Sequence, residues 1–223
     1  MTEKVTPPSS RTQIRRVRER GHYDQKTIES IAQDSLVCHI AFADDKGVHC
    51  IPTACWVKHG HLYIHGSNGS RMIQALMAGE ASVTMTHLDG IVLARSAFHH
   101  SMNFRSVVAY GKFEKVESES EKMKSFEAFI EFLSPGRWPM VRQPSRNELA
   151  ATTVLRLPLT EAAAKIRNWG VKDDEADMQQ AVWAGVIPLS MEAGKPEPDV
   201  GCEHMPAPQQ PSLGPLPTFF NQI

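Results

Sequence analysis

One stretch of the chain has the residue types that hold a phosphate group. Over residues 63–71 a strand-like segment (Tyr-Ile-His) passes through Gly-Ser-Asn-Gly and reaches Ser70 and Arg71, where a helical pattern begins. Unpaired N–H groups at a helix N-terminus carry partial positive charge and bind anions. Ser70 adds a hydroxyl donor, and the planar Arg71 guanidinium matches two phosphate oxygens. The stretch predicts a phosphate site, although an ordinary loop with a serine cap has the same composition.

A second stretch, residues 98–106, contains the adjacent histidines His99 and His100 and then enters a strand pattern. Neighbouring side chains point to opposite sides of an extended chain, so the two rings make a poor chelating pair. No thiolate or carboxylate stands at ligand spacing from them, and we therefore expect no metal site. The sequence leaves the role of both histidines open.

Near the C-terminal end, Lys165 and Arg167 fall on one side of the chain if that segment is extended. Both could then contact one anionic ligand, or they could form a solvated basic pair. Trp183 follows as a core, interface or cofactor residue. The sequence has no GxSxG elbow, no GxxxxGKS loop and no GxGxxG, which excludes the usual hydrolases, NTPases and Rossmann dehydrogenases.

The elements that must position these residues are mainly strands. Pro52 interrupts one of them and therefore predicts a sheet edge or a bulge there. The hairpin spacing of the strand patterns favours a mainly β fold, a six-stranded antiparallel split barrel with peripheral helices. Segments with strand composition, from which the barrel would be built, cover residues 36–43, 48–57, 62–66, 81–87, 91–96, 105–116 and 149–159.

Three helices are expected around the barrel. Asp24 can cap the first, which turns Ile28 and Ile31 inward. The second begins near Ser70. The third covers residues 119–133, where apolar side chains fall on one helical face and the following Pro-Gly pair ends the helix.

Length and composition predict one core with two appendages. Of 223 residues, 41% are hydrophobic and 22% are charged, as in ordinary globular proteins. We expect a disordered lead-in over residues 1–10, a core over 11–193, and a Pro-rich tail or wrapping arm over 194–223. The arginine-rich stretch 11–20 is expected to pack on its own domain or on a partner subunit.

Charge, hydropathy and cysteine usage limit the partners. The net charge of −1 offers no field that would attract nucleic acid. No apolar run is long enough to span a membrane, and no signal peptide is visible. The four cysteines lack CxxC spacing, which is typical of reduced thiols in a cytoplasmic protein.

In their order along the chain, several segments resemble the FMN-binding split-barrel superfamily related to pyridoxamine 5′-phosphate oxidase, and within it the nitroimidazole-resistance-like branch. The resemblance spans about residues 11–190. The matching segments are 20–24, 38–42, 51–53, 62–67, 93–106, 135–138, 164–167 and 183–188.

The resemblance implies a homodimer with one FMN in each of two clefts between the subunits. It places Ile51, Pro52 and Thr53 along the flavin ring. It also implies that the turn that contains Ser67, Ser70 and Arg71 binds the FMN phosphate. The other residues that it brings to the cofactor are Arg105 and Ser106 on one strand, and Lys165, Arg167 and Trp183 from the C-terminal part.

His65 matches a histidine that such relatives present to the flavin and the substrate pocket. It is the candidate catalytic residue, because an imidazole with a pKa near neutrality can deliver a proton. The alternative is a histidine that only fixes the neighbouring loop.

These features together predict a reductase that takes hydride from NAD(P)H, which binds transiently, and reduces a small electrophilic molecule of the nitro or quinone kind. A flavin carrier or sensor without turnover and a haem-binding relative are the alternatives. Vitamin B6 oxidation is disfavoured, because Met72 replaces the lysine of those oxidases and the chain after Pro188 lacks their substrate-binding ending.

Overall fold

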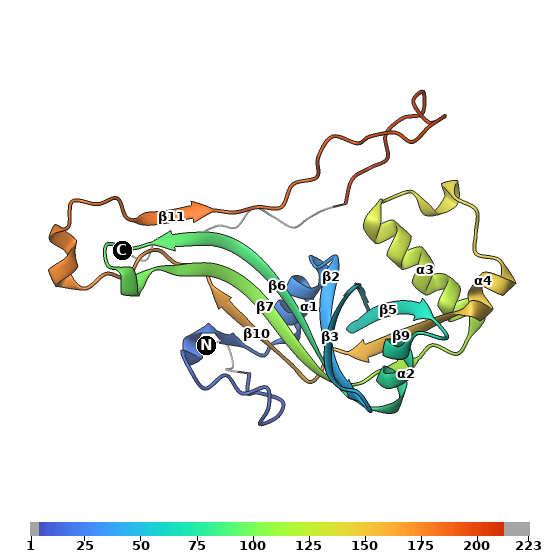
Figure 1. Cartoon of the computed structure of the whole chain (residues 1–223), viewed down its shortest axis with the longest axis horizontal. Helices are drawn as coiled ribbons and strands as arrows, with labels where there is room; N and C mark the ends of the chain where they lie inside the picture. Colours follow the sequence, from blue (N-terminus) through green and yellow to red (C-terminus); the bar gives the residue numbers. More distant parts are fainter. Residues whose placement is uncertain (1–4, 212–223) are drawn as a thin grey trace.

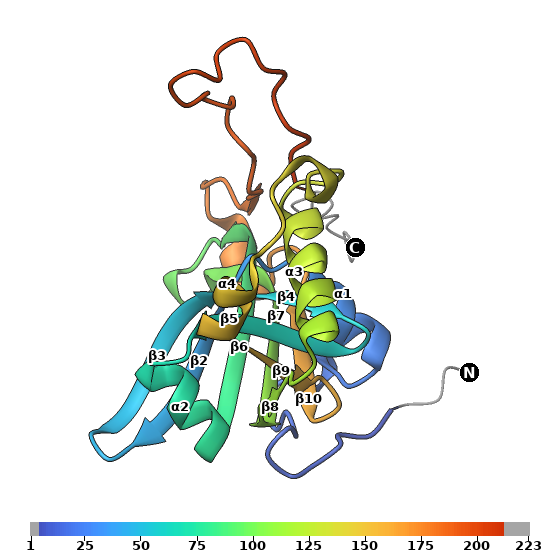
Figure 2. The ribbon, with the colours of Figure 1, turned by 90° about the vertical axis from the view of Figure 1, so that its right-hand side faces the viewer.

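Two antiparallel sheets enclose a shared apolar core in the computed structural model, which describes residues 5–211 (Figures 1 and 2). Sheet A has the order β1 (Gly21–His22), β10 (Ala162–Arg167), β7 (Ser101–Lys112), β6 (Glu80–Leu93), β2 (Val37–Asp44), β3 (Gly47–Ala54), with β11 (Gly185–Pro188) beside β6. Sheet B has the order β4 (Trp56–Lys58), β5 (His61–Ser67), β9 (Thr152–Pro158), β8 (Glu114–Lys115). The sheets do not close on each other, and the predicted split barrel is confirmed.

The inward residues of the strands alternate with outward ones and fill the barrel. Four helices cover it: α1 (Gln25–Gln33), α2 (Arg71–Ala78), α3 (Glu119–Leu133) and α4 (Arg146–Ala151). Helix α1 begins where the Asp24 carboxylate accepts the N–H of Thr27 at 2.9 Å, as predicted. The barrel core is apolar throughout and includes Ile28, Ile40, Ile64, Ile73, Val83, Leu155 and Leu157.

Helix α3 covers the outer face of sheet B and creates a second, aromatic core. Phe126 and Phe129 of the helix pack against Trp56, Tyr63 and strand β9. The helix has the bounds that the apolar spacing predicts. Sheet B is thus covered on both faces, by the barrel core on one side and by α3 on the other.

The longest hairpin, formed by β6 and β7, extends beyond the barrel (Figure 1). Its register shifts between Leu88 and Gly90, and past this bulge β11 pairs with β6. We call this outer part, residues 90–103 with β11, the arm. The short 3-10 turn η2 (Ala97–His99) forms its tip, where the Phe98 side chain is 90% exposed.

Several predicted boundaries were wrong. Residues 81–87 and 91–96 are one strand, β6, because the Asp-Gly pair between them forms a bulge and not a turn. The next strand begins at Ser101 and not at 105. The expected strand 48–57 divides at Cys55 into β3 and β4, which belong to different sheets.

Two elements near the C-terminal end also differ from the prediction. Residues 146–151 form α4, because Ser145 and Glu148 make a reciprocal capping box, so the strand expected from 149 starts at Thr152. Strands β10 and β11 were not predicted. Residues 194–211 hold neither helix nor strand, and the predicted ends of the chain, 1–4 and 212–223, lie outside the described residues.

The basic stretch packs on its own domain, which is one of the two expected arrangements. Arg11 forms ion pairs with Glu161 at 2.6 Å and with Glu80 at 2.8 Å, and its guanidinium lies 5.0 Å from the centre of the Tyr110 ring. At the end of the 3-10 turn η1 (Arg18–Arg20), Arg20 lies against Trp169.

Gly66 sets the distance between β5 and α2. A Cβ atom there would stand 2.8 Å from Cγ1 of Ile73, a fully buried side chain. We expect Gly66→Ala to lower the free energy of unfolding by about 1–3 kcal/mol, as overpacked cores do. Gly69→Ala is the control, since a Cβ at Gly69 meets nothing within 4 Å. Urea unfolding of both variants tests this, and equal stability of the two would refute the close contact.

Candidate functional site

The residues of the predicted phosphate site, Ser70 and Arg71, lie at the N-terminus of α2. Ser70 is the cap residue with extended backbone, and its hydroxyl makes no capping hydrogen bond. The first backbone bond of the helix is that of Gln74 N–H to Ser70 O, so the N–H groups of residues 71–73 have no partner within the helix. Ser67 supports the turn, since its carbonyl accepts the Ser70 N–H at 2.9 Å.

The loop before α2 is held from two sides. The Asn68 side chain donates to Ala150 O and accepts from the Thr153 hydroxyl, both at 2.7 Å. The side-chain amide of Gln74, a residue of α2, donates to Asn68 O at 2.7 Å. A loop fixed in this way presents its N–H groups in one arrangement, which favours binding of a fixed anionic group.

Arg71 stands beside the β2–β3 hairpin, in a cluster that the sequence did not predict. Its Nε lies 3.5 Å from Asp44 Oδ2, and its Nη2 lies 3.4 Å from His49 Nδ1. His49 Nε2 in turn lies 2.9 Å from Asp44 Oδ1. The Lys46 N–H, then His49 and Arg71, hold the pKa of Asp44 below its ordinary value. The Arg71 side chain is still 47% exposed and can contact a ligand.

Strand β3 is the edge of sheet A, as Pro52 predicted. It pairs with β2 alone among the described strands, so the outer polar backbone groups of the strand are open. Ile51 and Thr53 are half-buried and Pro52 is exposed. This edge can lie along a planar ring, as the resemblance implies for residues 51–53.

His65 lies on the outer face of sheet B, under α3, and not in the barrel core. Its ring is 5.3 Å from the Phe129 ring and 5.8 Å from the rings of Trp56 and Phe126, centre to centre. Neither ring nitrogen forms a hydrogen bond within residues 5–211, and Nδ1 is buried. Burial lowers the pKa of His65, so the imidazole is neutral at pH 7.

Arg105 is engaged within the chain. It forms ion pairs with Asp34 at 2.8 Å and with Asp89 at 3.1 Å. Ser106 next to it donates its hydroxyl to Lys165 O at 3.4 Å. The two carboxylates neutralise the guanidinium. For Arg105 to contact a flavin as predicted, its guanidinium would have to release one of these carboxylates. That contact stays a prediction.

The C-terminal candidates do not meet Ser70 and Arg71 within one chain. Lys165 is half-buried on β10, opposite Ser106. Arg167 is buried, with hydrogen bonds to Trp169 O and Gly170 O. Trp183 is 62% exposed and precedes β11 of the arm, where its ring covers Gly185. Figures 1 and 2 place α2 and the arm at different ends of the molecule.

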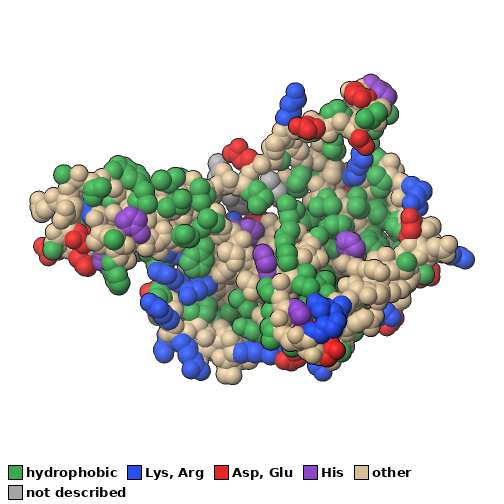
Figure 3. Space-filling model, in the orientation of Figure 1, with side chains coloured by type: hydrophobic (Ala, Val, Ile, Leu, Met, Phe, Trp, Pro, Cys, Tyr) green, Lys and Arg blue, Asp and Glu red, His purple; other side chains and the backbone are tan. Residues whose placement is uncertain are grey.

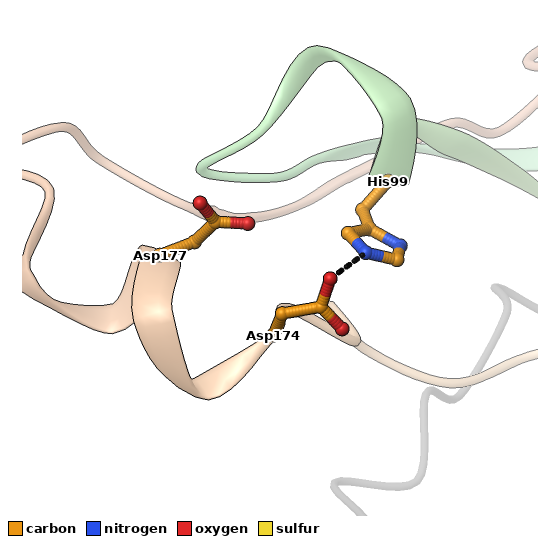
Figure 4. Close-up of side chains that lie close together, drawn as sticks. All are labelled: His99, Asp174 and Asp177. Carbon is orange, nitrogen blue, oxygen red and sulfur yellow. Dashed lines mark hydrogen bonds and ion pairs between the residues drawn. The ribbon is translucent and has the colours of Figure 1, made fainter.

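At the tip of the arm, His99 meets two aspartates of the chain segment that crosses it (Figure 4). Its Nε2 lies 3.2 Å from Asp174 Oδ2, and ligand atoms of His99, Asp174 and Asp177 lie within 4.8 Å of one another. Asp173 beside them forms an ion pair with Arg95 at 2.8 Å. The Asp174 side chain is 76% exposed. These contacts hold residues 173–177 against the arm.

Comparison with known proteins assigns the fold to a family. The family model described as pyridoxamine 5′-phosphate oxidase matches residues 24–166. The chain belongs to the pyridoxamine 5′-phosphate oxidase family. The matched residues include strand β3, the α2 site and strand β7, which contain most of the predicted cofactor residues. No curated protein matches the chain.

Two solved structures are similar over most of the chain. The flavocytochrome Anf3 of Azotobacter vinelandii is 35% identical, with a TM-score of 0.85 over 90% of this chain and 94% of that one. The FAD and haem binding protein of Mycobacterium smegmatis is 30% identical, with a TM-score of 0.80 over 85% and 94%. The neighbours of this chain are thus flavin-binding split-barrel proteins, some of which also bind haem.

A third structure shares the fold alone. It is a protein of Bacteroides thetaiotaomicron assigned to 5-nitroimidazole antibiotic resistance, 19% identical, with a TM-score of 0.54 over 66% of this chain and 86% of that one. Among residues 5–211, no helix is long and apolar enough to cross a membrane.

Proposed function

We propose that this protein is a flavin-dependent redox protein, which binds the phosphate end of FMN or FAD at the N-terminus of α2. The observation that carries the proposal is the free Ser70 hydroxyl beside unpaired N–H groups and a half-exposed arginine. These residues fit a flavin phosphate, because every group that they present is a donor or a cation. The bound flavin would supply hydride and single-electron transfer.

The residues of this chain have separate tasks in the proposal. Arg71, with Ser67 and Ser70, binds and orients the phosphate. The open edge of β3 at residues 51–53 holds the ring. Lys165 and Trp183 lie far from these groups in one protomer, so we propose that they reach the cofactor of a second copy of the chain. The protein would therefore work as a homodimer.

The dimer has a direct test. We expect the purified full-length protein to have a mass of about 50 kDa by light scattering, twice the 24.8 kDa of one chain. Closed two-fold assembly follows if each cofactor needs walls from both copies. A flavin-loaded protein that runs as a monomer at all concentrations would contradict the shared cleft.

The proposed reaction is NAD(P)H-dependent reduction of a small electrophilic molecule, of the nitro or quinone kind, in the cytoplasm. The nicotinamide would bind transiently, since the chain has no dinucleotide fingerprint. Neither nucleic acid nor membrane is a proposed partner. Vitamin B6 oxidation is not proposed, because Met72 stands in place of the expected lysine.

A second candidate, a flavocytochrome in which haem accepts the electrons, is favoured by His65. This neutral imidazole has no hydrogen-bond partner among the described residues and stands in an aromatic wall, which fits an axial ligand of haem iron. The two solved structures that are 35% and 30% identical bear names that include haem or cytochrome. In Figure 3 hydrophobic side chains gather in the hollow beside α3. Haem there would supply single-electron transfer.

One anaerobic experiment distinguishes the reductase from the flavocytochrome. NADH or NADPH is added to the purified protein, and the absorption spectrum is recorded before and after. Loss of the flavin band without a Soret band supports the reductase, and a Soret band that shifts on reduction supports the flavocytochrome. A flavin band that neither nucleotide bleaches would support the carrier and refute both.

A further inference from the structure

A group of basic and amide side chains meets where the N-terminal segment joins the end of strand β10. The Trp169 ring has two guanidinium groups near it, those of Arg20 at 4.9 Å and Arg167 at 5.1 Å from the ring centre. Arg20 ends η1 and Arg167 ends β10, so distant parts of the sequence build this cluster. Within residues 5–211 neither arginine has a carboxylate at ion-pair distance.

The cluster is buried and contains three donors without acceptors. Arg167 is 3% exposed and Asn103 is completely buried. The two terminal nitrogens of Arg167 donate to the Asn103 side-chain oxygen and to the carbonyls of Trp169 and Gly170. Nε of Arg167, Nε of Arg20 and Nδ2 of Asn103 remain buried with no partner among the described residues.

Physical chemistry limits what can complete this cluster. Burial, and then the charge of Arg20, lower the pKa of Arg167, because a second positive charge lies near it without compensation. All three free groups donate, and two belong to cations, so an anion with several acceptor oxygens would satisfy them. A phosphoryl group has three such oxygens and suits donors that come from different elements.

We propose that Arg20, Arg167 and Asn103 form an oxyanion site that binds a phosphoryl group. The site is separate from the N-terminus of α2, since Figures 1 and 2 place η1 and α2 on different sides of the molecule. The phosphoryl group comes either from inorganic phosphate or from a nucleotide such as the proposed nicotinamide co-substrate. The site itself does not depend on the proposed redox activity.

Calorimetric titration of the purified full-length protein with inorganic phosphate, and separately with NADP⁺, tests the site. The titration is repeated in Arg71→Ala protein, in which binding at the α2 site is expected to be weakened, so that the two sites can be told apart. We expect Arg20→Gln to weaken binding by about tenfold to a hundredfold, the loss for a charge-assisted hydrogen bond. Arg18→Gln, an exposed arginine of the same turn, is the matched control and should bind as the parent protein does.

Arg20-dependent binding of NADP⁺ that is tighter than that of phosphate supports the nucleotide as the source, and Arg20-dependent binding of phosphate alone supports the free anion. Arg20→Lys, which keeps the charge, should retain part of the affinity if Arg20→Gln proves unstable. Absence of binding for both probes, or binding unchanged in Arg20→Gln, overturns the proposal. Flavin absorbance in the same samples reports the redox proposal independently.

Discussion

Arg71→Ala is expected to weaken FMN binding by about tenfold to a hundredfold and riboflavin binding much less. The guanidinium belongs to the first turn of α2, lies beside Asp44 and His49 and is 47% exposed, so a ligand can reach it. A hydrogen bond between two charged groups contributes about 1.5–3 kcal/mol, which is the source of that range. Riboflavin lacks the phosphate, so the variant and the parent protein should bind it about equally.

Quenching of flavin fluorescence during titration of the apoprotein measures both affinities. Arg146→Ala is the matched control, because Arg146 is also the first residue of a capped helix, α4, and lies far from α2 in sequence. Its FMN affinity should equal that of the parent protein. An equal loss for FMN and riboflavin in Arg71→Ala would remove Arg71 from the phosphate site.

His65→Gln is expected to lower turnover of an electron acceptor about a hundredfold, while flavin content and reduction by NAD(P)H stay near normal. Glutamine keeps hydrogen-bonding capacity but neither transfers a proton at neutral pH nor ligates haem iron well. Loss of general acid catalysis has this magnitude. Because burial lowers the pKa of His65, a role as proton donor also requires turnover by the parent protein to rise as the pH falls and the ring takes up a proton. Loss of a Soret band in the variant distinguishes the ligand from the proton donor.

The control is His61→Gln, four positions earlier on the same face of β5, where the ring is hydrogen-bonded to His59 O at 2.8 Å. We expect stopped-flow kinetics of this variant to match the parent protein. If His65→Gln loses flavin with no separate effect on turnover, the histidine only supports the fold.

Burial of His65 also predicts a direction for the pH dependence of stability. Because its pKa is lower in the folded chain, the unfolded chain binds a proton first as the pH falls. The contribution of His65 to stability is therefore complete above the unfolded pKa of about 6.5 and is lost progressively below it. In His65→Gln this part of the pH dependence should be absent.

The sequence predicted those elements that are decided by neighbouring residues. Asp24 caps α1, and the apolar spacing of residues 119–133 gives α3 its bounds. The predicted strand boundaries were wrong where pairing with a strand that is distant in the sequence decides the structure. The pair Asp89-Gly90 has the composition of a turn, but the ladder with β7 continues across it. Strand β11 has four residues and exists only because β6 offers an edge on the arm.

The same division holds for the candidate site. Ser70 and Arg71 could be placed at the start of a helix from the sequence, because the signals for a helix start are local. Asp44 and His49, which face Arg71, were missed since nothing in the hairpin sequence indicates how α2 packs beside it. The partners of Arg105 are 16 and 71 residues away in the chain, so its neutralisation by Asp89 and Asp34 could not be read from its surroundings.

Flavin binding by this chain can be tested with the cofactor content of the purified full-length protein. The protein is purified, its absorption spectrum is recorded, and the cofactor is released by denaturation, identified by chromatography and counted against the chain. We expect about one FMN or FAD per chain, bound in a two-fold dimer. A colourless protein that also fails to quench the fluorescence of added FMN or FAD would contradict it.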